Sequence, residues 1–297
     1  MRFEYAHRLD MVICDGKHFR AGSKEHKRVL ISFMDDSTRM CLMTKVGESE
    51  NSRVFLRGLY DLIRHHGVPR LLFMDNGSGF KNHEVDEICS KLKINIVYGT
   101  ARYPEGRGKI ERFNRTITTK LLRGFRKNPE IDSHISFLER MIKKWIHEYN
   151  NTVHRSLGIS PYEKWSSDKT EINFPYDSEK LREMFSITFL RKVSADNIIQ
   201  HLSCSYELPA GYSGRKVKLI ENVITNEISF NHKGKLILLK KVDLAYNAEV
   251  KRKGKGKTKK EKPVVDVVTV LNELLKKTSF QLVDENGNFF GKKEENL

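Results

Sequence analysis

Apolar residues in the first half of the chain follow two periods, one typical of strands and one typical of helices. Apolar runs of strand length end at Asp15-Gly16 and cover residues 28–36 and 39–46. Short polar segments separate these runs, which predicts three consecutive strands in an antiparallel meander.

Beyond residue 48 the period changes. Apolar positions between 49 and 66 repeat every three to four residues, which predicts an amphipathic helix that ends at Gly67. A short apolar run at 70–74, a helix at 83–92 and a strand at 94–99 follow. Strands that are first antiparallel and then alternate with helices predict a mixed α/β sheet.

Two longer helices and an all-β segment follow. One helix opens near Gly108, and a second covers residues 133–153. Five short apolar runs between 187 and 247, separated by Gly and Pro turns, are typical of a small all-β barrel. The predicted organisation is a first domain at 1–165, a linker at 166–186, the barrel at 187–247 and a basic flexible tail with a short helix at 248–297.

Charge narrows the class of partner. The 297-residue chain carries a formal net charge of +16, which favours a polyanion because neutralised phosphates release their counterions. A basic soluble protein without such a partner has the same charge. We expect a cytoplasmic, nucleoid-associated protein without a membrane partner, because no apolar run has the length of a membrane span and no signal peptide is apparent. The four cysteines form no CxxC pair and are expected to be reduced and buried.

Three acidic residues lie where such sheets gather their sites. Asp15 ends the first predicted strand, Asp75 ends the fourth, and Glu111 lies in the first turns of the helix that opens near Gly108. Carboxylate oxygens are the ligands that Mg²⁺ prefers. Taken singly, each residue also has an ordinary explanation, as a turn residue or as a favourable partner of a helix start.

The sequence around these acids favours a functional role over an ordinary structural one. Four segments occur in order along the chain: ISFMDDSTR (31–39), VPRLLFMDNGSGF (68–80), YPEGRGKIERFNRT (103–116) and YNNTVHRSLGISPYEKW (149–165). They resemble the integrase catalytic core of DDE-type insertion-sequence transposases, and 35 residues separate Asp75 from Glu111, as in the D, D35E superfamily. EYAHRLDMVICDGKHF (4–19) looks like the first strand of that family and puts Asp15 at its first acid. The later β segment looks like the small barrel of Mu-like transposases.

The resemblance implies a ribonuclease-H-like mixed five-stranded sheet with flanking helices, followed by the small barrel. It also implies a metal-dependent polynucleotidyl transferase. Such an enzyme hydrolyses double-stranded DNA at transposon ends and then transfers the 3′-OH strand into target DNA. Asp15, Asp75 and Glu111 would hold two Mg²⁺ ions, with Asp15 bridging them and Mn²⁺ as a substitute. Asp35 and Asp36 look like scaffold residues of the family.

Polar and basic residues near these acids are candidates for DNA contact. For those on the helix, a basic face exposed to solvent is the alternative explanation. Beside a phosphodiesterase site we favour phosphate contact. The candidates are Asn76, Arg107, Lys109, Arg112, Arg115, Lys251, Arg252 and Lys253.

A second hypothesis is a truncated, non-catalytic DNA-binding remnant that multimerises with a full-length transposase or regulates it. Family members carry helix-turn-helix domains before the core, whereas 14 residues precede Asp15. We expect a homo-oligomer on DNA, with a helper ATPase or a full-length transposase as further partners. A plain ribonuclease H is less favoured, because neither the sequence around Glu111 nor the barrel has a role in such an enzyme.

Overall fold

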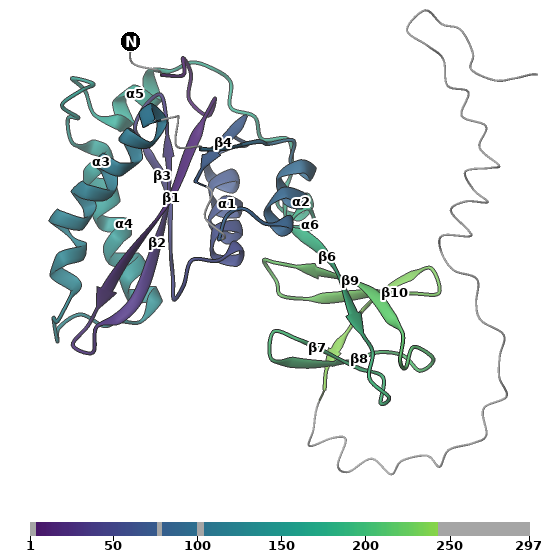
Figure 1. Ribbon diagram of the computed structural model, residues 1–297. Coiled ribbons are helices and arrows are strands. Elements are labelled where there is room, and N and C mark those ends of the chain that lie inside the picture. The colour runs from purple at the N-terminus through teal and green to yellow at the C-terminus, as the bar shows by residue number, and fades with distance from the viewer. Residues whose placement is uncertain (1–3, 76–78, 100–103, 243–297) are drawn as a thin grey trace, which may run out of the picture. The chain divides into compact units, whose positions relative to one another are not determined.

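A mixed five-stranded sheet forms the centre of the first 165 residues (Figure 1). The computed structural model describes residues 4–75, 79–99 and 104–242, with the side chains of 104–107 left aside. The strands are β1 (Val12–Ala21), β2 (His26–Asp35), β3 (Cys41–Gly47), β4 (Leu71–Met74) and β5 (Asn95–Tyr98), in the order β3-β2-β1-β4-β5. The first three pair antiparallel, whereas β1–β4 and β4–β5 are parallel. The predicted ribonuclease-H-like sheet is confirmed.

Helices cover both faces of this sheet, and Figure 1 shows α1 on one side with α3 and α4 on the other. The helices of the core are α1 (Ser52–His66), α2 (His83–Lys91), α3 (Pro104–Lys120), the 3₁₀ turn η1 (Leu122–Phe125), α4 (Ile135–Asn151) and α5 (Pro161–Ser167). Alternate residues of β1 enter different cores: Cys14 packs with the side chains of α1, and Ile13 packs with those of α3 and α4. Because side chains alternate along a strand, Asp15 shares the face of Ile13 and points toward α3.

Two predicted boundaries are wrong. Strand β1 does not end at Asp15, since Asp15 pairs with Ser32 and the pairing with β2 continues to Ala21. The apolar pattern ends earlier than the strand because most of its residues from Asp15 to Arg20 are only partly buried. Helix α3 begins at Pro104 rather than near Gly108, and proline is well tolerated in the first turn of a helix. Glu111 therefore lies deeper in the helix than expected.

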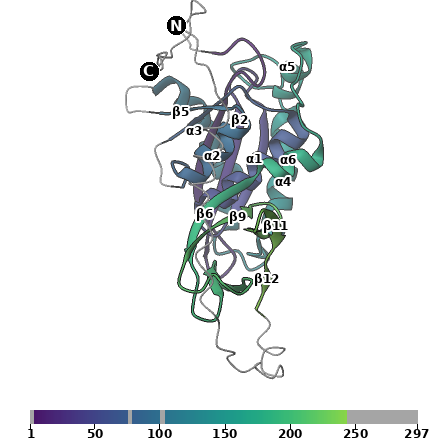
Figure 2. The same cartoon turned by 90° about the vertical axis from the view of Figure 1, so that its right-hand side faces the viewer.

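The all-β segment after the core is present as two small antiparallel sheets, whose strands are seen in Figure 2. Helix α6 (Ser178–Met184) precedes them. The sheets have the orders β11-β10-β9-β6 and β12-β8-β7 and share one hydrophobic core. Their strands are β6 (Ser186–Lys192), β7 (Ile198–His201), β8 (Cys204–Glu207), β9 (Lys216–Asn222), β10 (Ile228–His232), β11 (Lys235–Leu238) and β12 (Lys240–Lys241).

Strand β7 was not predicted. The run from Leu202 was interpreted as one strand, but Leu202 and Ser203 have φ values of 47° and 63° and form the turn of the β7–β8 hairpin. The proposed domain boundaries stay a prediction, and residues 243–297 lie outside the described part of the chain. All four cysteines are free, as expected, but Cys204 is only partly buried, whereas burial was predicted for all four. Among the described helices, none is long and apolar enough to span a lipid bilayer.

Candidate active site

Asp15 is held between its own strand and helix α3. The side-chain nitrogen of Asn114 donates a hydrogen bond of 2.5 Å to Asp15 Oδ2, and the Gly16 backbone N–H donates to the same carboxylate. Burial raises the pKa of Asp15 to about 6, and the negative charge of Asp75 adds to that rise. Asp15 is therefore a carboxylate whose ionised form is disfavoured by its surroundings.

Asp75 reaches the same place from the neighbouring strand. It directly follows β4, which lies parallel to β1 with Ile13 opposite Phe73. Continuing this register for two residues brings Asp75 beside Asp15, in agreement with the charge interaction between them. The two predicted aspartates therefore lie together at adjacent strands.

Glu50 is a third acidic residue of this place that the sequence did not single out. Burial, followed by the charge of Asp75, raises the pKa of Glu50, while His18 acts in the opposite direction. Two glycines make room for it: a Cβ at Gly16 would lie 2.5 Å from Glu50 Oε2, and a Cβ at Gly79 would lie 2.8 Å from its Cγ. The sequence offers no signal for Glu50, because it lies in the loop before α1 and its neighbours are distant in the chain.

Glu111, the third predicted acid, is exposed on α3. Among the described residues, no group of three or more His, Cys, Asp or Glu has a geometry that could hold a metal ion. Asn114 follows Glu111 by three residues on the same helix, a spacing that makes the two side chains neighbours on its surface. The structure thus brings Asp15 and Asp75 together, and it brings the helix of Glu111 to Asp15 through Asn114.

The basic residues predicted to contact DNA divide into two kinds. Arg112 and Arg115 are exposed on α3, and the Arg112 Nε donates to the Gly108 carbonyl. Lys109 differs from the prediction: its side chain is 6% exposed and forms an ion pair of 2.5 Å with the fully buried Asp36. A buried, paired ammonium cannot reach a phosphate, so in this structure Lys109 is a core residue. Asn76, the side chain of Arg107, and Lys251, Arg252 and Lys253 lie outside the described residues.

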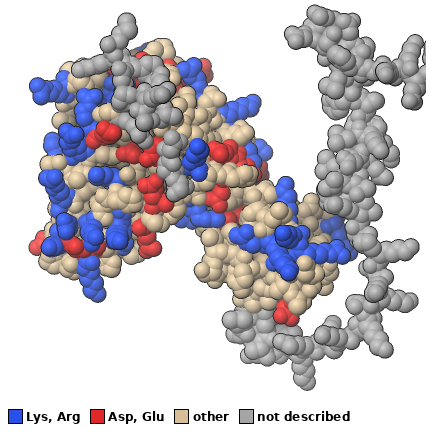
Figure 3. Space-filling view, viewed as in Figure 1, with Lys and Arg blue, Asp and Glu red and all other residues tan. Residues whose placement is uncertain are grey.

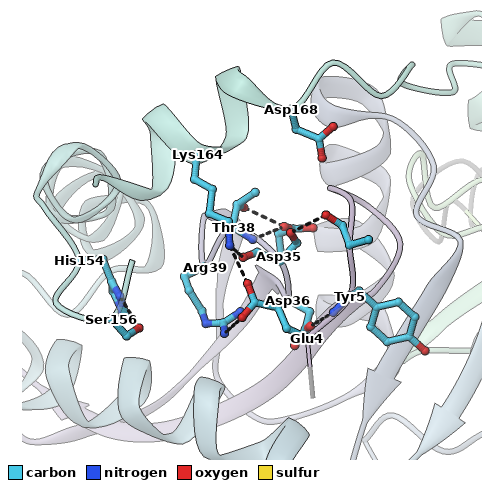
Figure 4. A network of polar contacts seen from close by, with 12 residues as sticks. Glu4, Tyr5, Asp35, Asp36, Thr38, Arg39, His154, Ser156, Lys164 and Asp168 are labelled. Atoms are coloured by element: carbon cyan, nitrogen blue, oxygen red, sulfur yellow. Dashed lines mark hydrogen bonds and ion pairs between the residues drawn. The ribbon is translucent and has the colours of Figure 1, made fainter. Parts of the chain in front are cut away.

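Asp35 and Asp36 are buried anchors, in keeping with their expected scaffold role, and Figure 4 shows the polar contacts around them. Asp35 Oδ2 accepts from the backbone and the hydroxyl of Thr38, at 2.8 and 2.7 Å. Asp36 Oδ2 accepts from the Tyr5 backbone N–H at 2.9 Å. These bonds fix the turn between β2 and β3 against the segment that leads into β1.

Charged side chains are unevenly placed on the face seen in Figure 3. Aspartate and glutamate gather in the middle of the core on that face, and lysine and arginine lie around them. An acidic centre with a basic surround suits a bound cation next to a polyanion.

Comparisons with known proteins agree with this fold. Residues 60–126 match the sequence family described as the TnsB C-terminal domain. The chain is 31% identical over 140 residues to the transposase for transposon Tn552 of Staphylococcus aureus, covering 44% of this chain and 29% of that protein. It is 23% identical over 149 residues to a transposase-like protein, y4bF, of Sinorhizobium fredii, covering 44% and 33% respectively. The chain thus spans about a third of the length of these relatives.

A solved structure shares the fold. It is the simian T-cell lymphotropic virus intasome in complex with the PP2A regulatory subunit B56 gamma, matched with a TM-score of 0.50 and 16% identity over 82% of both chains. At this identity the likeness concerns the fold alone. The sequence matches, in turn, show similarity to transposases and to the TnsB C-terminal domain.

Proposed function

We propose that this chain catalyses metal-dependent DNA strand transfer, in which a DNA end is hydrolysed and its 3′ hydroxyl is then joined to target DNA. The observation that carries the proposal is the pair of carboxylates, Asp15 and Asp75, held together on adjacent strands and facing the helix of Glu111. The similarity to transposases supports the same reaction class.

The side chains at this place fit a hard divalent cation. Their donors are carboxylate and amide oxygens, the ligands that Mg²⁺ and Mn²⁺ accept. Among the described atoms, the buried Oδ1 of Asn114 has no hydrogen-bond partner, which leaves an oxygen lone pair beside Asp15. The raised pKa of Asp15 also supports a cation site, because a nearby cation would offset the effects of burial and of the Asp75 charge on this carboxylate.

Within this proposal each residue has a role. Asp15, Asp75 and Glu111 would hold the divalent ions, while Asn114 keeps Asp15 in place through its hydrogen bond. When bound, divalent ions at these residues would lower the pKa of the attacking water and help to orient the 3′ hydroxyl. Arg112 and Arg115, exposed on the same helix as Glu111, contact phosphates of the bound strand.

The substrate we infer is double-stranded DNA, since the net charge is +16 and the chain's relatives are transposases. We infer that the chain acts as a multimer on DNA, as an intasome does. Sedimentation of the protein with and without a DNA end would measure this assembly directly. If a helper ATPase is a partner, adding it should stimulate DNA joining only when ATP is hydrolysed.

The decisive assay is joining of a pre-cleaved oligonucleotide duplex to a second duplex at low salt, with Mg²⁺ or Mn²⁺. Asp75→Asn and Glu111→Gln remove the proposed ligands without changing side-chain size. Asp196→Asn and Glu130→Gln are matched controls, because both residues are exposed and lie outside the site.

We expect metal-dependent joining by the wild type and by both controls, with loss in Asp75→Asn and Glu111→Gln. If the wild type binds DNA in a salt-sensitive manner but never joins it, the non-catalytic DNA-binding alternative replaces this proposal. Joining that persists in Glu111→Gln would remove Glu111 from the site and leave the two aspartates.

A further inference from the structure

The ion pair between Lys109 and Asp36 lies in the interior, close to the proposed active site. Lys109 Nζ and Asp36 Oδ1 are 2.5 Å apart, and their side chains are 6% and 0% exposed. Lys109 comes two residues before Glu111 on α3. Among the basic residues at the start of α3 whose side chains are described, Lys109 is the one that turns inward.

Asp36 is itself rigidly held. Its backbone N–H donates to the Met11 carbonyl at 3.0 Å, and its second carboxylate oxygen accepts from the Tyr5 backbone at 2.9 Å. Met11 directly precedes β1, the strand of Asp15. Lys109 is therefore tied, through one side chain, to the base of the strand that carries the first catalytic acid.

This contact limits how α3 can rotate about its own axis. At 3.6 residues per turn, Lys109 and Glu111 point to roughly opposite sides of the helix, and Glu111 and Asn114 point about 60° apart. With Lys109 fixed inward, the side of α3 that carries Glu111 and Asn114 is fixed as well, and Asn114 is seen to bond Asp15.

Stability is a weak explanation for such a pair. Two charges taken out of water lose hydration that their mutual attraction recovers only in part, and an apolar pair of similar volume often serves as well. A costly pair beside an active site is better explained by the geometry that it imposes.

We propose that Asp36 and Lys109 are positioning residues that set the rotation of helix α3, so that Glu111 faces the side of Asn114 and Asp15. This inference rests on the proposed function, because it gives the pair a role in placing the third acid. It also replaces the phosphate contact that the sequence predicted for Lys109.

The two roles make opposite predictions for two variants. Asp36→Asn breaks the ion pair but keeps the Lys109 charge, and Lys109→Met removes that charge. Lys120→Met is the matched control, since Lys120 is an exposed lysine at the far end of the same helix. Single-turnover joining and the salt dependence of DNA binding are measured for each.

Positioning predicts that Asp36→Asn and Lys109→Met both slow joining by about 10- to 100-fold, the usual effect of losing a residue that orients a metal ligand. DNA affinity and its salt dependence stay unchanged, the Mg²⁺ concentration for half-maximal joining rises, and Lys109→Arg restores part of the rate. Phosphate contact predicts instead that Lys109→Met weakens DNA binding with a smaller salt slope, while Asp36→Asn joins normally. That second result would overturn the inference.

A measurement without metal or DNA separates this inference from the proposed function. Amide hydrogen exchange should show faster exchange at residues 108–114 in Asp36→Asn and Lys109→Met, and not in Lys120→Met. Unchanged protection there in both variants rejects positioning, whether or not the wild type joins DNA.

If the single variants fail to fold, the apolar pair Asp36→Leu/Lys109→Met removes both charges together and is expected to fold. It should still join slowly, because an apolar contact does not fix the helix rotation. Joining at the wild-type rate by this double variant would show that the ion pair is not needed.

Discussion

Replacing Asp15 by asparagine should stabilise the metal-free protein while abolishing its proposed activity. Burial, and then the charge of Asp75, raise the pKa of Asp15 from its ordinary value of 3.8 to about 6. The ionised carboxylate is therefore less stable in the folded chain than in the unfolded chain. The substitution Asp15→Asn would remove that charge and keep an oxygen that can accept the hydrogen bond of Asn114.

The size of the effect follows from the pKa shift. A rise from 3.8 to about 6 corresponds to about 3 kcal/mol of lost stability at neutral pH, since one pKa unit is worth about 1.36 kcal/mol. An amide cannot accept all the hydrogen bonds of a carboxylate, which removes about 1 kcal/mol of that gain. The partial exposure of Asp15 reduces it further. We expect a gain of about 1–2 kcal/mol, or roughly 2–8 °C in Tm for a chain of this size.

The pH dependence has a definite sign. A carboxyl group with a raised folded pKa contributes stability below its unfolded pKa of 3.8, and this is lost as the pH rises through about 6. The advantage of Asp15→Asn is therefore fully present at pH 8 and falls to about half at pH 5. Thermal unfolding in EDTA at both pH values measures it, with Asp196→Asn as the matched control for the change in net charge.

Adding Mg²⁺ should reverse the order of the two proteins. A cation that binds only the folded wild type raises its Tm with concentration, and the variant lacks a proposed ligand. If Asp15→Asn unfolds at a lower temperature than the wild type in EDTA at pH 8, the reasoning from burial and charge repulsion fails. If Mg²⁺ stabilises both proteins equally, Asp15 is not a metal ligand.

Three further substitutions test the packing that supports the site. Gly58→Ala should destabilise the fold by about 1–3 kcal/mol, because a Cβ there would lie 2.5 Å from Cε2 of Phe33; a higher midpoint in urea would contradict it. Asn150→Leu should lower the free energy of unfolding by about 2–4 kcal/mol, because the Asn150 amide bonds both the N–H and the carbonyl of Cys41 in β3 at 2.9 Å. Equal urea midpoints for the variant and the wild type would refute this. Arg53→Met removes the Arg53 contacts of 2.5 and 2.8 Å from the buried Glu221 and leaves it with His201 Nε2 at 2.8 Å, at a cost of about 3 kcal/mol. Burial raises the pKa of Glu221, but Arg53 and His201 together hold it below its ordinary value of 4.5. The deficit should therefore be greatest at neutral pH and shrink below 4.5; a pH-independent deficit would contradict this.

The sheet and its helices could be predicted from the sequence because burial imposes a period. The helix expected from residue 49 begins at Ser52, after the N-cap Asn51 whose side chain accepts from the Val54 N–H. Strand β4 and helix α2 each lie within one residue of their predicted bounds. Each of these elements buries one regular set of side chains against a single core.

Strand ends were predicted less well, because an apolar pattern reports burial and not hydrogen bonding. The second half of β1 pairs with β2 through residue pairs such as Lys17–Leu30, but its side chains from Asp15 to Arg20 are only partly buried or exposed. A polar, half-exposed strand has the same composition as a loop. The pattern therefore placed Asp15 at a strand end when it lies inside a paired strand.

Partners of the site were the hardest to predict, and Lys109 shows why. It stands four residues before the buried Phe113, so helical spacing already puts it at the edge of the apolar stripe, unlike Arg112 and Arg115. That spacing indicates that the Lys109 side chain points inward, but it does not identify the residue that pairs with it, because Asp36 lies 73 positions away. A basic residue near a phosphodiesterase site is easily interpreted as a DNA contact when only its neighbours in sequence are known. In the folded chain the inward ammonium pairs with Asp36, whose backbone N–H bonds the Met11 carbonyl just before the strand of Asp15.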